Sequence, residues 1–196
     1  MKAKKKKKIR LLFILVIILL IIMLVFFFAR RKETIKHMTG SVEKAGGSKK
    51  VVEIEKKTIT LFFLSENDEL LHPEEREIYL ASSSPDELAR AIVEEIIKGS
   101  SQGKMSTLPE GTKLRQLYIT SDGTAYVDFS RRITEGNYYG SSGEMAAVYS
   151  VVNSLAYNLK SVKKVVILVE GNEKETLGGH VDLSHPFAPD FSLVAK

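Results

Sequence analysis

The feature that most constrains this chain is an uninterrupted apolar run near its start. Leu11 to Ala29 comprises 19 residues without a charge, a glycine or a proline. A helix rises about 1.5 Å per residue, so this run would reach about 28 Å, close to the roughly 30 Å hydrocarbon core of a bilayer. Because lipid offers the backbone no hydrogen-bond partners, the run predicts one transmembrane helix over residues 11–29.

The residues on either side of the run predict its orientation. Seven Lys and Arg residues lie within residues 1–10, and three follow at Arg30, Arg31 and Lys32. Basic residues are retained in the cytoplasm, so residues 1–10 are expected to be a basic cytoplasmic tail. No small-residue cleavage site follows the run, which predicts an uncleaved signal anchor. We therefore expect a single-pass protein of the cell membrane, bound to the lipid bilayer through its N-terminal helix, with its C-terminal domain extracytoplasmic.

Charge divides the rest of the chain. Residues 1–57 carry 16 Lys and Arg against 4 Asp and Glu, whereas residues 58–196 carry 13 against 20. The second part is therefore acidic and repels phosphate backbones, which argues against nucleic acid as a partner. Residues 30–57 are polar and contain Gly-Ser stretches, so they are expected to be a linker, and residues 58–196 are expected to be one domain. The absence of cysteine excludes thiol catalysis and Cys-ligated metal sites.

The domain alternates predicted strands with two predicted helices. Ser84, Pro85 and Glu87 predict a capped helix start, and Gly99 predicts its end. A second helix is expected to open with the capping box Ser141–Glu144 and to bury a face made of Met145, Val148, Val152, Leu155 and Leu159. Strands are expected at Thr58–Leu64, Arg76–Ala81, Lys113–Thr120, Thr124–Ser130 and Val165–Val169, with a tight turn at Asp122-Gly123.

The resulting order, ββαββαβ, predicts an α+β fold in which two helices pack on one face of one mixed β-sheet. Val165–Val169 is a continuous apolar run and is expected to be central in that sheet.

Two patterns resemble ligand sites. Gly99–Ser106 resembles a phosphate-binding loop, but it is one residue short, has Met105 where a hydroxyl should hold magnesium, and follows a helix rather than a strand. His180, Asp182 and His185 are metal-ligand types, yet His185 is expected to point away from the other two, which favours a strand end and a turn. We expect no cofactor and no metal at either place.

Two further patterns resemble catalytic sites. Ser141-Ser142 lacks the strand–turn–helix context of a hydrolase nucleophile. Glu74-Glu75 and Glu94-Glu95 could suggest the paired acids of a glycosidase, but adjacent residues diverge, so each pair is expected on a solvated face. No catalytic residue is therefore predicted, and the protein is not expected to be an enzyme.

Eight segments in order resemble the GerMN domain family of sporulation and germination proteins. They are Ile59–Phe63, Ile96–Gly99, Leu108–Thr112, Asp122–Ser130, Ser141–Glu144, Val151–Leu155, Val166–Gly171 and Gly179–Ser184. The resemblance implies a non-enzymatic extracytoplasmic interaction domain whose fold is similar to the ring-building domains of sporulation channels. Family members often carry a lipid-modified cysteine or two such domains in tandem, whereas this chain has an apolar helix and one domain.

Three functions are compatible with these observations. The first is a membrane-anchored scaffold or protein-interaction domain of the cell envelope, linked to sporulation or germination, whose partner is an envelope protein or a second copy. The second is a module that binds cell-wall polymer, for which Tyr138-Tyr139 could stack on sugar rings. The third is a hydrolase, which has the least support.

Overall fold

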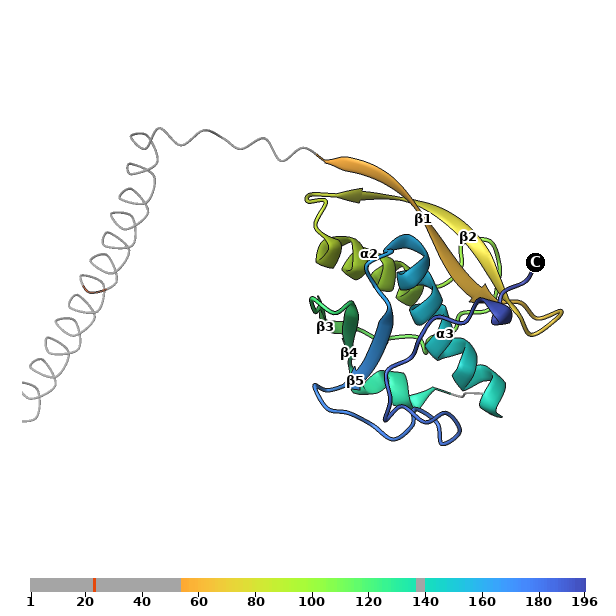
Figure 1. Cartoon of the computed structure of the whole chain (residues 1–196). Helices are drawn as coiled ribbons and strands as arrows, with labels where there is room; N and C mark the ends of the chain where they lie inside the picture. Colours follow the sequence, from red (N-terminus) through yellow and green to blue (C-terminus); the bar gives the residue numbers. More distant parts are fainter. Residues whose placement is uncertain (1–22, 24–53, 137–139) are drawn as a thin grey trace, which may run out of the picture. The chain divides into compact units, whose positions relative to one another are not determined.

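The computed structural model describes Met23, residues 54–136 and residues 140–196 of the 196-residue chain (Figure 1). The predicted cytoplasmic tail and most of the predicted linker lie outside these residues, as does the predicted transmembrane helix apart from Met23. Among the described residues, no helix combines the length and the hydrophobicity that a membrane span requires. Residues Val52–Lys196 form a unit of their own, and the following description concerns this unit.

This unit is an α+β domain with two sheets. Strands β1 (Glu55–Leu64) and β2 (Leu71–Leu80) form an antiparallel hairpin, in which Glu55 pairs with Leu80 and Leu64 with Leu71. The second sheet has the order β3-β4-β5, with β3 antiparallel and β5 parallel to β4. The remaining elements in chain order are α2 (Pro85–Lys98), β3 (Leu114–Ile119), β4 (Thr124–Phe129), η1 (Arg131–Glu135), α3 (Gly140–Asn158), β5 (Lys164–Val169) and η2 (Phe191–Leu193).

The prediction of one mixed sheet is wrong, because α3 occupies the edge of β1 where another strand would pair. The side chain of Asn158 accepts a hydrogen bond from the Thr60 N–H at 3.0 Å and donates one to the Thr60 carbonyl at 2.7 Å. The Ser154 hydroxyl accepts from the Phe62 N–H at 3.1 Å. These side chains replace the bonds of a neighbouring strand, so the hairpin remains separate from β3-β4-β5.

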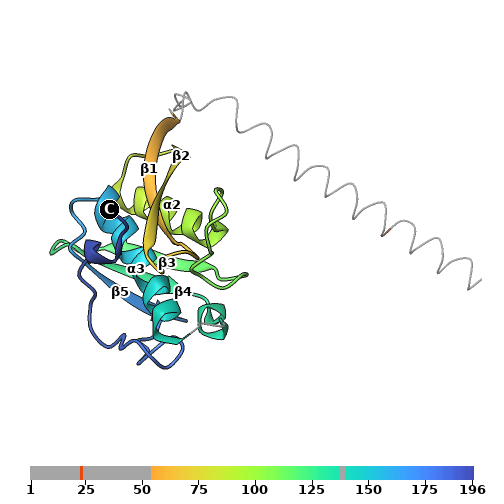
Figure 2. The same ribbon diagram turned by 90° about the vertical axis from the view of Figure 1, so that its right-hand side faces the viewer.

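Both helices contact both sheets. Helix α2 packs against β1, β2 and β3, and α3 packs against β1 and β5. Figures 1 and 2 show the hairpin running across one end of the domain, with the three-stranded sheet further down. One hydrophobic core therefore joins the two sheets and the two helices; its fully buried members include Leu61, Phe63, Ile92, Val127, Val152 and Ile167.

The first helix and the second hairpin form as predicted. The Ser84 hydroxyl accepts from the Glu87 N–H at 3.2 Å, Pro85 is the first helical residue, and Gly99 ends α2 with φ 83°. This φ favours glycine, and a Cβ at Gly99 would also lie only 2.5 Å from the Ser106 hydroxyl oxygen, which would have to move. In the turn between β3 and β4, Gly123 has φ 89°, as a tight turn requires.

Two strand boundaries differ from the prediction. Strand β1 begins at Glu55, three residues before Thr58, and β2 begins at Leu71, five residues before Arg76. The earlier part of β2 contains Pro73, which usually argues against a strand. Proline is tolerated here because β2 pairs only with β1 and its other edge has no partner strand.

Three predictions about the C-terminal half are wrong. Strand β5 lies at the edge of its sheet rather than in the centre, and most of its apolar side chains are buried in the core. Its outer edge is partly paired, because Phe187 exchanges two backbone hydrogen bonds with Val165, at 2.9 and 2.8 Å. Met145 is exposed rather than buried. The capping-box prediction also fails, because α3 already begins at Gly140 and the Glu144 side chain turns into the protein.

Candidate functional site

The loop that resembles a phosphate-binding loop holds a carboxylate of the protein itself. The Glu74 side chain, on β2, is completely buried, and both of its oxygens accept hydrogen bonds from the loop after α2. Ser100 donates its hydroxyl at 2.5 Å, and Ser101 donates its backbone N–H at 2.9 Å and its hydroxyl at 2.8 Å. Lys104 lies 3.6 Å away. Together with Arg76, these residues form what we call the Glu74 cluster.

Arg76 connects the Glu74 cluster to the end of helix α2. Its guanidinium donates to the Glu74 carboxylate at 2.5 Å and to the Gly99 carbonyl at 3.0 Å. It also donates to the Glu95 side chain at 2.9 Å and to the Glu95 carbonyl at 3.1 Å. One arginine thus links the strand, the C-terminal end of the helix and the loop that follows it.

The cluster keeps Glu74 ionised. Burial alone would raise the pKa of this carboxyl group, but the hydrogen bonds from Ser100, Ser101 and Arg76 outweigh burial and lower the pKa from 4.5 to about 2. The pKa of Glu95 is also lowered, because hydrogen bonds from Lys98 and Arg76 outweigh its partial burial. Neither carboxyl group is therefore protonated near neutral pH, as a general acid would have to be.

The Glu74 cluster corrects one prediction and explains another. Glu74 and Glu95 were expected on solvated faces, but Glu74 is buried and Glu95 is largely enclosed, whereas Glu75 and Glu94 are exposed. In each of the two adjacent glutamate pairs, one side chain is enclosed and the other is exposed, so neither pair forms the two facing acids of a glycosidase. The resemblance of Gly99–Ser106 to a phosphate-binding loop has a structural reason: its N–H and hydroxyl groups donate to the carboxylate of Glu74.

The three residues of metal-ligand type in the C-terminal segment do not converge. His180, Asp182 and His185 are all exposed and lie in an irregular segment, not at the end of a strand as expected. The Asp182 carboxylate accepts from the Ser184 N–H at 2.8 Å, which lowers the pKa of Asp182 together with the Ser184 hydroxyl. Within residues 54–136 and 140–196, no three His, Asp or Glu side chains are grouped as a metal site would need.

Glu144 is a second buried carboxylate, which the sequence analysis had assigned to a helix cap. Its carboxylate is fully buried and accepts from the N–H groups of Leu177 at 2.7 Å and His180 at 2.9 Å. Burial raises the pKa of Glu144, but the backbone N–H groups of Gly178, His180, Leu177 and Val181 lower it by a larger amount. Glu144 thus attaches the long C-terminal segment to helix α3.

A hollow lies at the start of α3, beside Ser141 and Ser142. Ser141, Ser142, Glu69 and Met145 line a cavity of about 190 Å³, next to a second of about 430 Å³ lined by residues 105–110, Arg132 and Glu135. Arg132 is bound by the Glu135 side chain at 3.0 Å and the Glu110 carbonyl at 2.8 Å. Among the described residues that line the two cavities there is no histidine to activate a serine. Tyr138 and Tyr139, the predicted sugar-stacking pair, lie outside the described residues.

The described surface carries an aromatic patch that the sequence analysis did not identify. Tyr157 and Phe191, each nearly half exposed, pack edge-on around the buried ring of Phe62, with centroids 5.5 and 6.1 Å from it. The Lys160 ammonium lies 5.2 Å from the Tyr157 ring. Tyr157 falls between the buried positions Leu155 and Leu159, so the helical period predicts its exposure. Its contact with Phe191 could not be predicted from the sequence.

Comparison with known proteins identifies the family. Residues 60–175 match the Germane family, described as sporulation and spore germination. The chain belongs to the Germane family. The GerMN resemblance found in the sequence is thereby confirmed. No curated protein is a significant match to the chain.

Solved structures of the sporulation protein GerM from Bacillus subtilis share the fold. Its first GerMN domain has a TM-score of 0.52 and 22% identity, over 67% of this chain and 97% of that domain. Its tandem GerMN domains give a TM-score of 0.55 and 21% identity, over 68% of this chain and 46% of the tandem. The Germane chain described here therefore spans less than half of the tandem, and at these identities the likeness establishes the fold alone.

Proposed function

We propose that this Germane protein is a membrane-anchored, extracytoplasmic protein-interaction module of the bacterial cell envelope, linked to sporulation or germination, and that it is not an enzyme. The observation that carries the proposal is the match of residues 60–175 to a family of sporulation and spore germination. The apolar run Leu11–Ala29 supports the anchor, because its length suits one membrane crossing.

The buried ionisable groups support a role in binding rather than catalysis. Glu74 and Glu144 are held by donors of the protein itself, and Asp128 accepts from Arg115 at 2.9 Å and from the Gly171 N–H at 2.8 Å. Each carboxylate joins segments that are distant in sequence, so its charge stabilises the fold. A domain fixed to a membrane by a tether meets its partners at a high local concentration, so weak contacts can suffice.

A complementation experiment tests this function. In a spore-forming host that lacks the gene, we expect the full chain to restore sporulation or germination, and the double variant His180→Ala/His185→Ala to restore it equally. A chain in which residues 11–29 are replaced by a cleavable signal peptide should restore it poorly, because the domain is then released from the membrane. Loss of function in the histidine variant alone, with normal protein levels, would indicate a reaction centre and contradict the proposal.

A second function, binding of cell-wall polymer, is favoured by the aromatic patch of Phe62, Tyr157 and Phe191. Exposed rings next to a cation resemble surfaces that stack on sugars and bind anionic polymer. The test is sedimentation of the full chain with purified wall polymer. Retention that Tyr157→Ala removes and Tyr118→Ala does not would support this second function; Tyr118 is a matched control because it is similarly exposed on β3.

A further inference from the structure

The pairing of the first hairpin determines which backbone groups of β2 point outward. Ser65 N–H donates to the Leu70 carbonyl at 2.9 Å, so hydrogen-bonded pairs alternate along the hairpin from that point. Glu75, Glu77 and Tyr79 consequently occupy positions whose N–H and C=O groups face away from β1, and the C=O group of Pro73 faces the same way. The Leu71 carbonyl, two residues before Pro73, confirms this direction because it accepts from Ala195 N–H on the outer side at 3.0 Å.

The outer edge of β2 is open, whereas the other strand edges are at least partly occupied. Side chains of α3 occupy the edge of β1, and residues 172 and 187 pair with β5. On β3, the Ile119 N–H donates to the Asp86 side chain at 3.1 Å. Within the described parts of the chain, the outward N–H and C=O groups of Glu75, Glu77 and Tyr79 have no hydrogen-bond partner. An unpaired row of this kind can accept an added strand.

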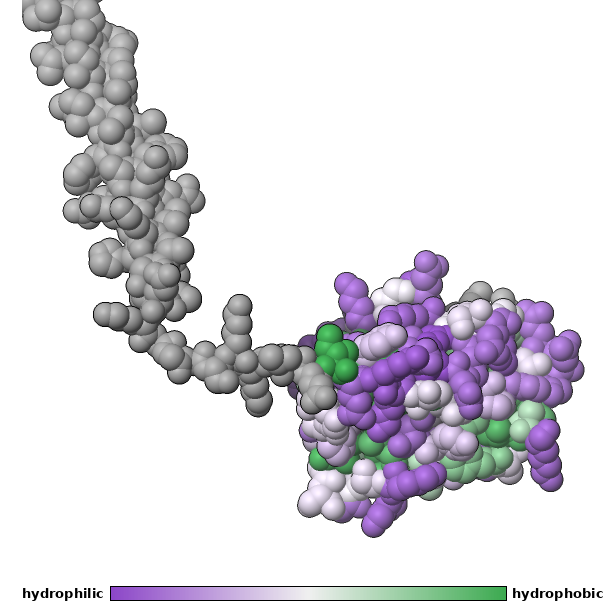
Figure 3. All heavy atoms as spheres, turned by 90° about the horizontal axis from the view of Figure 1, so that it is seen from above, coloured by the Kyte–Doolittle hydropathy of each residue, from purple (hydrophilic) through white to green (hydrophobic). Residues whose placement is uncertain are grey.

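The side chains beside this open edge determine which strand would fit. Glu75, Glu77 and Tyr79 all lie on the exposed face of the hairpin, and Tyr79 is 68% exposed. Glu77 pairs with Lys56 on the neighbouring strand β1 at 2.8 Å, whereas Glu75 faces Thr60. Figure 3 looks down on this end of the domain and shows a mainly hydrophilic surface.

We propose that the outer edge of β2, from Glu75 to Tyr79, binds an extended segment of a partner protein that carries Lys or Arg at alternate positions. The segment would pair with the outward N–H and C=O groups, and its basic side chains would lie beside Glu75 and Glu77, as Lys56 of β1 already lies beside Glu77. Opposite charges across neighbouring strands stabilise pairing, and like charges oppose it. Pro73 has no N–H to donate, which limits docking to the residues after it.

A second copy of this chain is a poor occupant of the same edge. Two β2 strands that met edge to edge would bring the acidic pair Glu75 and Glu77 of one copy against that of the other. The inference rests on the proposed function, because it names the surface and the chemical class of the partner for an interaction module.

Peptide binding to the full chain tests the inference directly. The chain is placed in nanodiscs of neutral lipid, and fluorescence anisotropy is measured with a labelled peptide of alternating valine and lysine, about seven residues long as in an ordinary strand. We expect it to bind about tenfold more tightly than the valine–glutamate counterpart, since two cross-strand charge pairs distinguish them. Equal binding of the two peptides would overturn the proposal.

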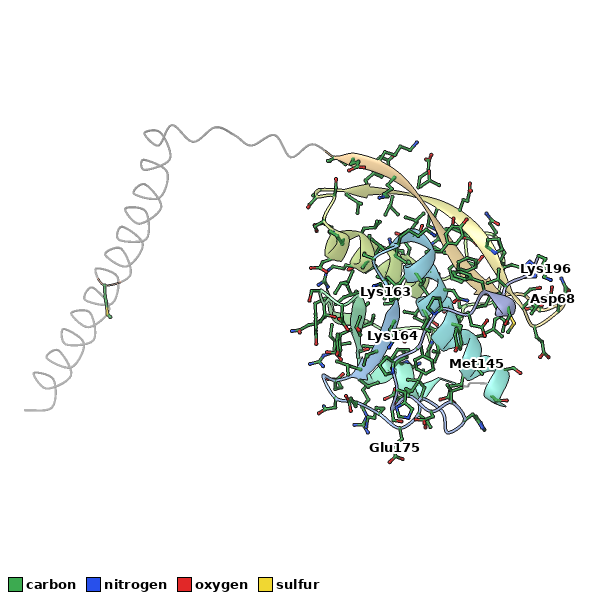
Figure 4. All side chains as sticks on the ribbon, in the orientation of Figure 1. Asp68, Met145, Lys163, Lys164, Glu175 and Lys196 are labelled. Atoms are coloured by element: carbon green, nitrogen blue, oxygen red, sulfur yellow. The ribbon has the colours of Figure 1, made fainter. Side chains whose placement is uncertain are left out.

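Two variants and one control locate the binding surface. Glu77→Pro removes an outward N–H group and should abolish binding, while Glu75→Lys/Glu77→Lys should reverse the preference between the two peptides. Glu173→Lys/Glu175→Lys makes the same change in net charge at exposed residues, and Glu175 lies at the end of the domain away from the hairpin (Figure 4). If the control alters binding as much as the charge reversal on β2, or if the reversal has no effect, the inference is wrong.

Crosslinking in cells separates failure of the inference from failure of the proposed function. A photo-reactive residue is placed at position 79 or, in the aromatic patch, at position 157. An envelope protein crosslinked from position 79, and lost in Glu77→Pro, supports the inference. Crosslinks from position 157 alone leave the interaction function standing and refute the β2 edge. A crosslinked dimer of this chain from position 79 also refutes it, and crosslinks from neither position contradict both proposals.

Discussion

Replacing Glu74 by glutamine tests whether the Glu74 cluster is a structural anion site. The substitution preserves shape but removes the charge that Ser100, Ser101 and Arg76 stabilise. The pKa falls from 4.5 to about 2 in the folded protein, and one pKa unit corresponds to about 1.4 kcal/mol, so the ionised form contributes about 3 kcal/mol to stability at neutral pH. This agrees with about 3–5 kcal/mol for breaking a buried pair.

The pH dependence of the effect has a definite sign. Because folding lowers the pKa of Glu74, its stabilisation is fully present above about pH 4.5 and is lost as the pH falls towards 2. Glu74→Gln should therefore lower the free energy of unfolding by about 3 kcal/mol at pH 7, and by progressively less below pH 4.5.

Urea unfolding of the full chain, followed by far-ultraviolet circular dichroism at pH 7 and pH 3, gives the measurement. Glu75→Gln is the matched control: Glu75 adjoins Glu74 but is exposed and should change stability by less than about 0.5 kcal/mol. If Glu74→Gln is as mild as the control at pH 7, or if its effect is the same at both pH values, the reasoning about the cluster is refuted.

Three further predictions concern the core, the C-terminal segment and the topology. Val152→Asp should abolish cooperative thermal unfolding, because Val152 is completely buried and an unpaired buried charge costs an amount comparable to the total stability; a cooperative transition near that of the wild type would contradict the predicted helix face. Glu144→Gln should accelerate tryptic cleavage after the exposed Lys174, since Glu144 holds the N–H groups of Leu177 and His180; unchanged cleavage would contradict that role. A C-terminal alkaline phosphatase fusion should be active and a β-galactosidase fusion inactive; the reverse pattern, or a mature chain beginning near Arg31, would refute the uncleaved anchor.

Local signals in the sequence predicted the elements whose causes are local. Ser84 and Gly99 fix the ends of α2 through groups a few residues away, and Asp122-Gly123 supplies the backbone conformation that its turn requires. Strand pairing could not be predicted in this way. The division into two sheets depends on Asn158 reaching Thr60, and these residues are distant in sequence.

The candidate site shows the same distinction. The loop at Gly99 was expected to hold no ligand, and its hydroxyl and N–H groups instead bind the side chain of Glu74, twenty-six residues before Ser100. Glu144 was predicted to complete a helix cap, yet it lies within α3 and its partners are Leu177 and His180. A charged residue is ordinarily solvated, so only the three-dimensional arrangement of its partners reveals that it is buried.

The central claim, an extracytoplasmic interaction module held at the membrane, is tested most directly by crosslinking intact cells with a reagent that cannot cross the membrane. Cells are stripped of their wall and treated, and the products attached to the tagged full chain are identified by mass spectrometry. The account predicts crosslinks through exposed lysines of the domain, such as Lys163 and Lys174, to an envelope protein or to a second copy. Protection of these lysines until the membrane is opened, with crosslinks only to cytoplasmic proteins, would contradict it.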